Sequence, residues 1–140
     1  LDDGHVRELQ AREASRPLPL DAWAASCLPR AEYDVVWLIR FWPRACLVTL
    51  PSIVAPRGLI VLSHFVHDPD PRIPRRGEPY LREYTSPPID KRIQRGELRA
   101  LLDHWDGMYG PHEILDECIE RVEDGRPVHS LVLRVHLHRL

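Results

Sequence analysis

The chain of 140 residues has the length of one domain of ordinary size. It is 44% apolar and 29% charged, with a formal net charge of −2 at pH 7, which argues against a protein whose main task is to coat nucleic acid. The sequence has no secretory signal and no run of about 18 apolar residues, so it predicts neither export nor a membrane span. The three cysteines, Cys27, Cys46 and Cys118, form no zinc-binding or disulfide pattern, which favours an intracellular compartment, cytoplasmic or mitochondrial.

The basic residues are unusual in kind. Of the 19 lysines and arginines, Lys91 is the only lysine. Arginine favours planar, two-point contacts with carboxylates and phosphates, although a coding bias of the source genome would give the same composition. The chain begins with Leu1 and not with methionine, so we expect further sequence upstream.

The first elements that the sequence predicts are short. Residues 6–10 are compatible with a strand, and Asp21 is a candidate N-cap for the apolar segment 23–28. Residues 33–42 and 59–65 are continuous β-branched and aromatic runs, typical of parallel strands buried on both faces. Between them we expect a helix over 45–55, with a kink at Pro51, and then a turn at 56–58.

The second half of the chain predicts a long loop, a helix and a hairpin. Residues 66–94 hold six prolines and five arginines, a composition typical of a functional lid or of disorder. A helix is expected over 96–105, and strands over 113–122 and 128–137 are joined by a turn containing Asp124-Gly125. Alternation in the last strand places His136 and His138 on a wet face, and we expect no metal site. The order of elements indicates an α/β fold, a parallel sheet with a C-terminal antiparallel β-hairpin.

Four short motifs carry a resemblance to a known family. They are YDVV at 33–36, PRGLIV at 56–61, RGELR at 95–99 and GRP at 125–127. Their order and spacing resemble the second half of class I S-adenosylmethionine-dependent methyltransferases, in particular the tellurite-resistance-like branch, over roughly residues 6–137. The resemblance implies that residues 1–140 form the C-terminal part of one Rossmann-like methyltransferase domain, from its third strand onward, with a Pro/Arg-rich lid at about 66–95.

The chain departs from that family at the cofactor. The glycine-rich loop after the first strand and the acidic residue that ends the second strand are absent, and these are the elements that approach the ligand and bind its ribose. The acidic residue expected after the third strand is displaced to Glu13, because Arg12 stands in its place. Arg57 replaces the first glycine of the family's turn.

The missing strands have a topological consequence. In the resembled fold the first and second strands lie between the third and the fourth, so without them residues 33–42 leave an apolar edge open. An open edge is a template for aggregation, and we expect an upstream segment or a partner chain to complete the sheet.

The candidate site residues follow from strand ends and from the resemblance. Ligands of open parallel sheets lie beyond the carboxyl ends of the strands. His64 is a candidate general base. S-adenosylmethionine is the implied cofactor, and the remaining candidates divide into a cofactor set of Glu13, Arg40 and Phe41 and a substrate set of Trp42, Ser63, Arg72, Arg75 and Arg76.

Each of these residues also has a plain structural interpretation. Arg40 and Trp42 are compatible with ordinary packing, His64 with a hydrogen-bonded rim histidine, and the loop arginines with a solvated surface balanced by nearby acids. Three functions therefore remain open. The first is methyl transfer to an unidentified acceptor, if upstream sequence supplies the cofactor loop. The second is a catalytically degenerate module with a structural or RNA-associated role in a larger assembly, and the third is a nucleotide-binding α/β domain of some other chemistry.

Overall fold

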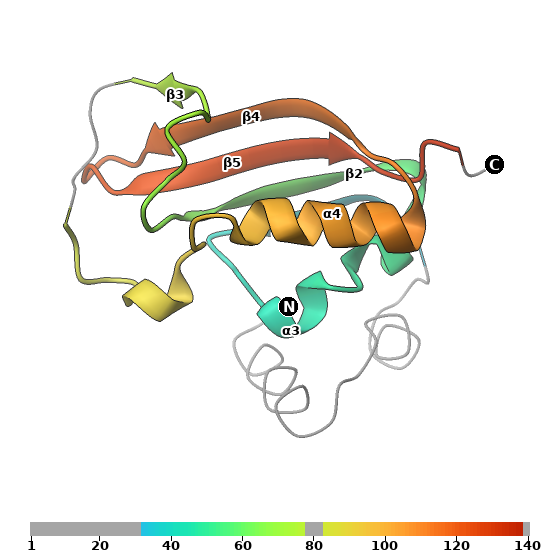
Figure 1. The fold of residues 1–140 in the computed structure, drawn as a ribbon, viewed down its shortest axis with the longest axis horizontal. Helices are drawn as coiled ribbons and strands as arrows, with labels where there is room; N and C mark the ends of the chain where they lie inside the picture. The colour runs from blue at the N-terminus through green and yellow to red at the C-terminus, as the bar shows by residue number, and fades with distance from the viewer. Residues whose placement is uncertain (1–31, 78–82, 139–140) are drawn as a thin grey trace.

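The computed structural model describes residues 32–77 and 83–138. These residues form an α/β domain around a mixed five-stranded sheet with the strand order β1-β2-β5-β4-β3 (Figure 1). The β1–β2 and β3–β4 pairs are parallel, whereas β5 runs antiparallel to both of its neighbours. The expected α/β class is confirmed, and the sheet is parallel only in part.

The two apolar runs form neighbouring strands, as predicted. β1 (Tyr33–Ile39) lies parallel to β2 (Val54–Phe65), with Val35 opposite Leu59 and Ile39 opposite Ser63. The prediction of a turn at 56–58 is wrong. The chain does not reverse there, because these residues belong to β2. They form an irregularity in which Arg57 takes a left-handed φ of 59°. At Gly58 a Cβ atom would lie 2.6 Å from Val54 Cγ1 and 3.0 Å from the Asp34 carbonyl oxygen, so only glycine allows this close approach.

The connection between β1 and β2 differs from the single helix expected over 45–55. It contains the four-residue helix α3 (Arg44–Leu47) and the 3₁₀ helix η1 (Leu50–Ile53). Pro51 sits in the first turn of η1, where the lack of an N–H group costs nothing. The helical ladder is therefore interrupted before Pro51, and β2 begins already at Val54.

The C-terminal half follows the predictions closely. α4 (Glu97–Tyr109) begins after Gly96 and ends before Gly110, and both glycines have positive φ. Its Leu98, Leu102 and Trp105 are buried on the sheet. β4 (Glu113–Arg121) and β5 (Pro127–Arg134) form the predicted hairpin, in which Gly125 has a φ of 92°.

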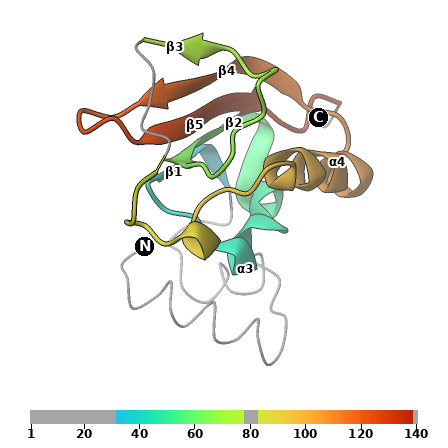
Figure 2. The ribbon, with the colours of Figure 1, turned by 60° about the vertical axis from the view of Figure 1, so that its left-hand side comes forward.

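The loop between β2 and α4 holds two short elements. They are the two-residue strand β3 (Arg75–Arg76), which pairs with β4, and the 3₁₀ helix η2 (Ile89–Lys91). Figure 2 shows β3 at the edge of the sheet opposite to β1.

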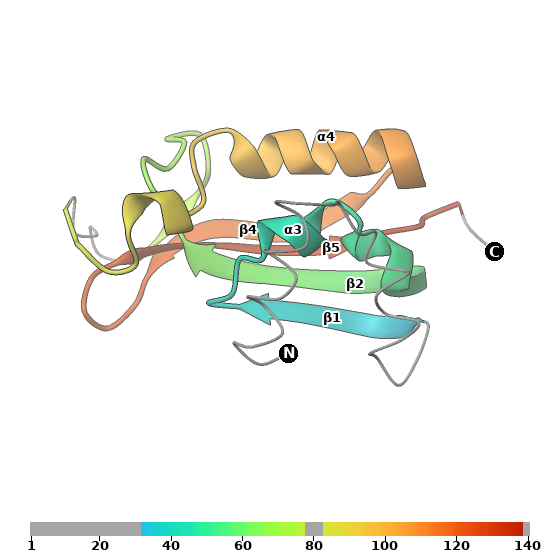
Figure 3. The ribbon, with the colours of Figure 1, turned by 90° about the horizontal axis from the view of Figure 1, so that it is seen from below.

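The helices lie on one face of the sheet (Figure 3). Ile60 and Leu62 of β2 and Leu131 and Leu133 of β5 face the core beneath them and are at most 1% exposed. The opposite face has no helix from the described residues on it, and there Trp37 is 68% exposed and Ile39 47% exposed. Burial of residues 33–42 on both faces is therefore a wrong prediction for the described part of the chain, since only one side of β1 packs on the core.

Several predictions fall outside the described residues. They are the strand at 6–10, the cap Asp21 with its segment 23–28, and Glu13. Among the helices that the structure describes, none has the length and apolar character needed to cross a membrane.

Candidate functional site at the strand ends

Arg40 begins the site at the carboxyl end of β1. It takes a left-handed φ of 57°, which non-glycine residues rarely adopt and which is often found at functional sites. Its backbone N–H donates to the Ser63 carbonyl at 2.6 Å, and its Nη1 donates to Ser63 Oγ at 2.5 Å. Ser63 Oγ also lies 3.1 Å from Ser130 Oγ on β5. The exits of β1 and β2 and the middle of the hairpin are thus joined by one polar chain.

The charge of Arg40 is only partly compensated. Burial lowers the pKa of its guanidinium, the carboxylate of Glu120 opposes that shift, and the nearby Arg126 lowers the pKa further. Arg40 and Arg126 both stack on the Phe65 ring, with 5.6 and 4.3 Å between each guanidinium carbon and the ring centroid. Two arginines beside one aromatic ring are suited to bind an anionic or planar group.

Trp42 and His64 form the part of the site that faces the helices. Their rings are parallel within 4°, with centroids 6.0 Å apart, and Phe65 meets His64 edge-on at 5.7 Å. Both residues are buried, at 8% and 6% exposure. Since Ser63 and His64 are consecutive in β2, their side chains point to opposite faces of the sheet. The two candidate residues therefore belong to two faces of the same strand end.

The two ring nitrogens of His64 have different environments. Nε2 donates a hydrogen bond to the Lys91 carbonyl oxygen at 2.8 Å. Burial lowers the pKa of the imidazole, the bond to Lys91 opposes this shift, and the charges of Arg40 and Arg44 add to it. His64 is thus neutral at pH 7 with its proton on Nε2, and its buried Nδ1 has no hydrogen-bond partner among the described residues. A buried acceptor without a partner is costly and marks a point where a ligand or water would be stabilised.

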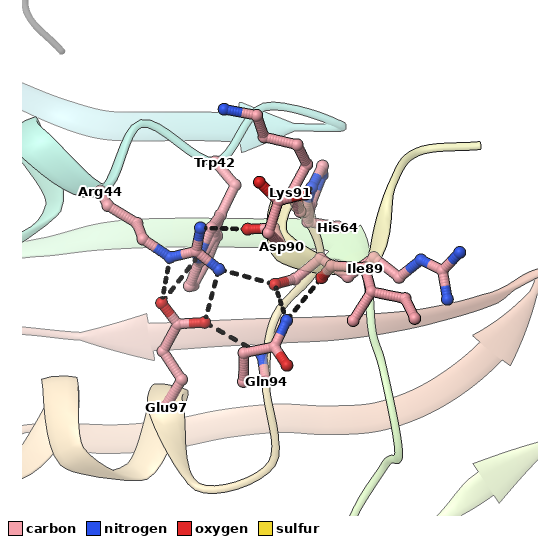
Figure 4. Close-up of polar contacts among 9 residues, drawn as sticks. Trp42, Arg44, His64, Ile89, Asp90, Lys91, Gln94 and Glu97 are labelled. Carbon is pink, nitrogen blue, oxygen red and sulfur yellow. Dashed lines mark hydrogen bonds and ion pairs between the residues drawn. The ribbon is translucent and has the colours of Figure 1, made fainter. Parts of the chain in front are cut away.

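A charged network that the sequence analysis missed surrounds this pair (Figure 4). Arg44 reaches the Glu97 carboxylate with Nε and Nη2, at 2.5 and 3.0 Å, and donates to the carbonyl oxygens of Asp90 and Arg92. Glu97 also accepts from Trp42 Nε1 at 3.3 Å and from the Gln94 N–H at 2.9 Å. The network fixes Trp42 over His64. Its sequence signal was Glu97 in the RGELR motif, but nothing in the sequence pointed to Arg44 as the partner.

The remaining candidates are spread over the molecule. Phe41 is half-buried and packs on the core next to Trp42. Arg75 and Arg76 form β3, and Arg76 binds Asp116 at 2.6 Å and Glu120 at 3.5 Å. The carboxylate of Glu120 thus acts electrostatically on both Arg76 and Arg40. Arg72 lies at the rim of a cavity beside α4.

Two other sequence expectations concern histidine and cysteine. His136 is buried, and its Nε2 lies 2.7 Å from the Pro51 carbonyl oxygen. Because a carbonyl oxygen can only accept, Nε2 carries the proton and donates this hydrogen bond. The wet face predicted for His136 is therefore wrong, because a left-handed φ of 52° breaks the alternation after β5. Cys46 and Cys118 are buried free thiols, and burial with nearby carboxylates raises the pKa of Cys118 to about 11. Within residues 32–77 and 83–138, no three His, Cys, Asp or Glu side chains gather as metal ligands would.

Comparison with known proteins adds one relative. No family model matches the chain, and no solved structure matches it. A curated relative in Schizosaccharomyces pombe, named "Uncharacterized protein UNK4.09", is 32% identical over 102 residues, which are 72% of this chain and 26% of the relative. The chain thus spans about a quarter of the length of the curated relative it matches, whose name states no activity.

Proposed function

We propose that the chain is the C-terminal part of a Rossmann-like methyltransferase domain of class I that uses S-adenosylmethionine. The observation that carries the proposal is the meeting of Arg40, Trp42, Ser63 and His64 at the carboxyl ends of two parallel strands. Ligands of open α/β sheets bind beyond such ends. The antiparallel hairpin after the parallel pair agrees with the order of elements that the resemblance implies.

The residues at the strand ends have complementary roles in this proposal. The cofactor supplies an electrophilic methyl group, and the transfer itself needs mainly alignment of donor and acceptor. Arg40 offers a guanidinium for an anionic group, and Phe41 offers an aromatic surface. Trp42 has little free surface because it is 8% exposed and lies against His64, so its role is to hold the imidazole in place.

His64 is the group that would accept a proton from the acceptor. Its Nε2 is held by Lys91, which leaves the Nδ1 lone pair as the basic site. Its lowered pKa keeps this lone pair free at neutral pH. A base acts only within hydrogen-bond reach of the proton that it removes, so the acceptor atom would have to approach Nδ1.

The proposal also requires a polypeptide segment in addition to residues 1–140. The resemblance places the main cofactor-binding loop upstream of Leu1, and the sheet face that carries Trp37 and Ile39 has no cover from the described residues. We therefore propose that an upstream segment or a partner chain packs on this face. Burial of about 100–200 Å² of apolar side chain would favour such packing by roughly 2–5 kcal/mol.

Isothermal titration of the full-length protein with S-adenosylmethionine and S-adenosylhomocysteine tests the proposal. We expect binding to both, weakened about tenfold in Arg40→Ala because one charge-assisted contact is lost. Arg121→Ala, which changes an exposed arginine of β4, is the matched control and should bind normally. Absence of binding heat in the unaltered protein would contradict the proposal.

A structural or RNA-associated role is the second candidate. It is favoured by Arg57, which has a left-handed φ within β2 at a position where the resembled family has glycine. In this case the protein would not bind the cofactor but would retain RNA in a salt-dependent manner, since counterion release governs such binding.

A further inference from the structure

A large cavity lies beside α4 and adjoins the end of β2, because Val66 lines it and His129 of its floor is the sheet partner of His64. Its volume is about 1000 Å³, at the upper end of the range for small-molecule sites. The loop at 66–73 and the segment 93–96 form one side, α4 forms the other, and the hairpin strands β4 and β5 form the floor. Most of the wall is apolar and comes from Val66, Pro69, Pro71, Ile73, Ile93, Leu98, Leu102 and Ile114.

The floor carries an acid and a histidine in direct contact. His129 Nε2 lies 2.9 Å from Glu117 Oε2, with side-chain exposures of 9% and 22%. Their partners in the sheet are Ile119 and Leu131, so the pair is a diagonal one across the hairpin. The proposed methyl transfer uses neither residue. A carboxylate has about four acceptor sites, and the bond from His129 occupies one of those on Glu117, so the pair can accept a further donor.

The arginines at the rim are each neutralised by an aspartate. Arg72 binds Asp70 at 2.7 Å, Arg95 binds Asp68 at 2.8 Å, and Arg99 approaches Asp103 to 3.5 Å. Hydrogen bonds from Arg72 lower the pKa of Asp70 to about 2, so that pair stays ionised at working pH. Glu117, by contrast, has only His129 as an ion-pair partner among the described residues. Among the acids that line the described cavity, Glu117 is thus the one whose carboxylate is not paired with an arginine.

We propose that this cavity binds an organic cation, an amine or guanidinium carried on an apolar chain. The cation would pair with Glu117 beside His129, and the chain would lie between α4 and the prolines of the loop. A partly buried carboxylate prefers a charged donor, which gives a stronger hydrogen bond than a neutral one. The inference is independent of the proposed methyl transfer.

Three probes of equal length separate charge from apolar burial. Hexylammonium, 1-hexanol and hexanoate are titrated into the full-length protein and followed by the amide NMR signals of α4 and β4. We expect hexylammonium to bind at least about tenfold more tightly than the other two, the effect of one charge-assisted hydrogen bond. Tighter binding of hexanoate would overturn the proposal in favour of the rim arginines, and equal or absent binding would overturn it as well.

Two variants locate the binding. Glu117→Gln keeps the size of the side chain and should abolish the preference for the cation, whereas Glu113→Gln, on the same strand but outside the cavity, should keep it. Ala100→Trp should block all three probes by filling the cavity from α4 without changing any charge. If Glu117→Gln does not fold, Ala100→Trp decides: unchanged binding there overturns the proposal. Titration with S-adenosylmethionine is measured separately, so its failure leaves this result unaffected.

Discussion

Arg44 and Glu97, 53 residues apart in the sequence, meet in a two-point ion pair between the start of α3 and the start of α4. The same guanidinium binds the carbonyl oxygens of Asp90 and Arg92. One side chain therefore holds together three segments that surround Trp42 and His64.

Removal of this arginine should loosen all three segments. Arg44→Ala is expected to lower the free energy of unfolding by about 1–2 kcal/mol, since hydrogen bonds to charged groups are strong but the side chain is 41% exposed. Arg99→Ala removes an exposed pair on α4 and should cost less than about 0.5 kcal/mol. Urea denaturation compares the two, and equal costs would contradict the role of Arg44.

The cost of Arg44→Ala should depend on pH. Burial tends to raise the pKa of Glu97, but hydrogen bonds from Arg44 and the Gln94 N–H outweigh it, so the pKa lies below its usual value. A depressed carboxyl pKa stabilises the fold above about pH 4 and loses this contribution as the pH falls through the folded-state value. The difference between the unaltered protein and the variant should therefore shrink when denaturation is repeated below about pH 4. A constant difference would show that the charge of Glu97 is not involved.

His64 should make the fold sensitive to mild acid. Its pKa lies below the ordinary value of about 6.5 because the ring is buried, so the unfolded chain takes up a proton that the folded chain does not. Stability is therefore highest above about pH 6.5 and falls as the pH drops toward the folded-state pKa. His64→Gln should reduce this slope between about pH 7 and 5, and His104→Gln, on the exposed side of α4, should leave it unchanged. The slopes come from urea denaturation at stepped pH.

Trp105 should be the most sensitive tryptophan of the described residues. It is 2% exposed, and its Nε1 donates to the Leu47 carbonyl at 2.8 Å. Trp105→Phe leaves that carbonyl without a partner and a gap in the core, at a cost of about 2–4 kcal/mol. Trp37→Phe, on an exposed side chain, should cost less than about 0.5 kcal/mol. Thermal unfolding compares the two variants, and an equal or larger loss of stability in Trp37→Phe would contradict the prediction.

Two neighbouring substitutions in β2 should have opposite effects. Gly58→Ala forces a Cβ against Val54 and the backbone of β1 and should destabilise by about 1–3 kcal/mol. Arg57→Gly relieves a left-handed φ of 59° and should stabilise by up to about 1 kcal/mol. Changes of the same sign in chemical denaturation would show that the irregularity is not strained as described.

If an upstream segment covers the exposed sheet face, as proposed, Trp37 should become buried in the protein that includes it. In the 140-residue chain labelled with 5-fluorotryptophan, the ¹⁹F resonance of Trp37, assigned with Trp37→Phe, should show a full solvent isotope shift, because the side chain is 68% exposed. In the full-length protein the shift should be largely lost. An unchanged shift would contradict the proposal that further chain covers β1.

Local patterns predicted most of the described elements. The two apolar runs gave neighbouring parallel strands, and the leucines of 96–105 gave the buried face of α4. Asp124-Gly125 gave the turn of the hairpin, because the required positive φ is a local property. The segment that packs on β1 could not be predicted, because an apolar run indicates that a strand is buried but does not identify the element that buries it.

The candidate site was predictable only where neighbours in sequence stay neighbours in space. Ser63 and His64 lie close to the end of β2, and Arg40 and Trp42 follow β1, so parallel pairing of the two strands brings these residues to the same edge of the sheet. The partnership of Arg44 with Glu97 depends on how α3 and α4 pack, which no local pattern encodes. The contact between Glu117 and His129 was accessible in principle, because it follows from the register of the predicted hairpin.

The position of β1 in the sheet has a consequence for local opening. Within the described sheet β1 has one neighbour, whereas β2 and β5 are each hydrogen-bonded on both sides. Backbone amides of β1 should thus exchange with deuterium earlier than those of β2 and β5, without global unfolding. Because Arg40 is tied to Ser63 across this pair, a ligand that bridges the two strand ends would protect β1 first, and the exchange pattern would report binding before any chemistry is known.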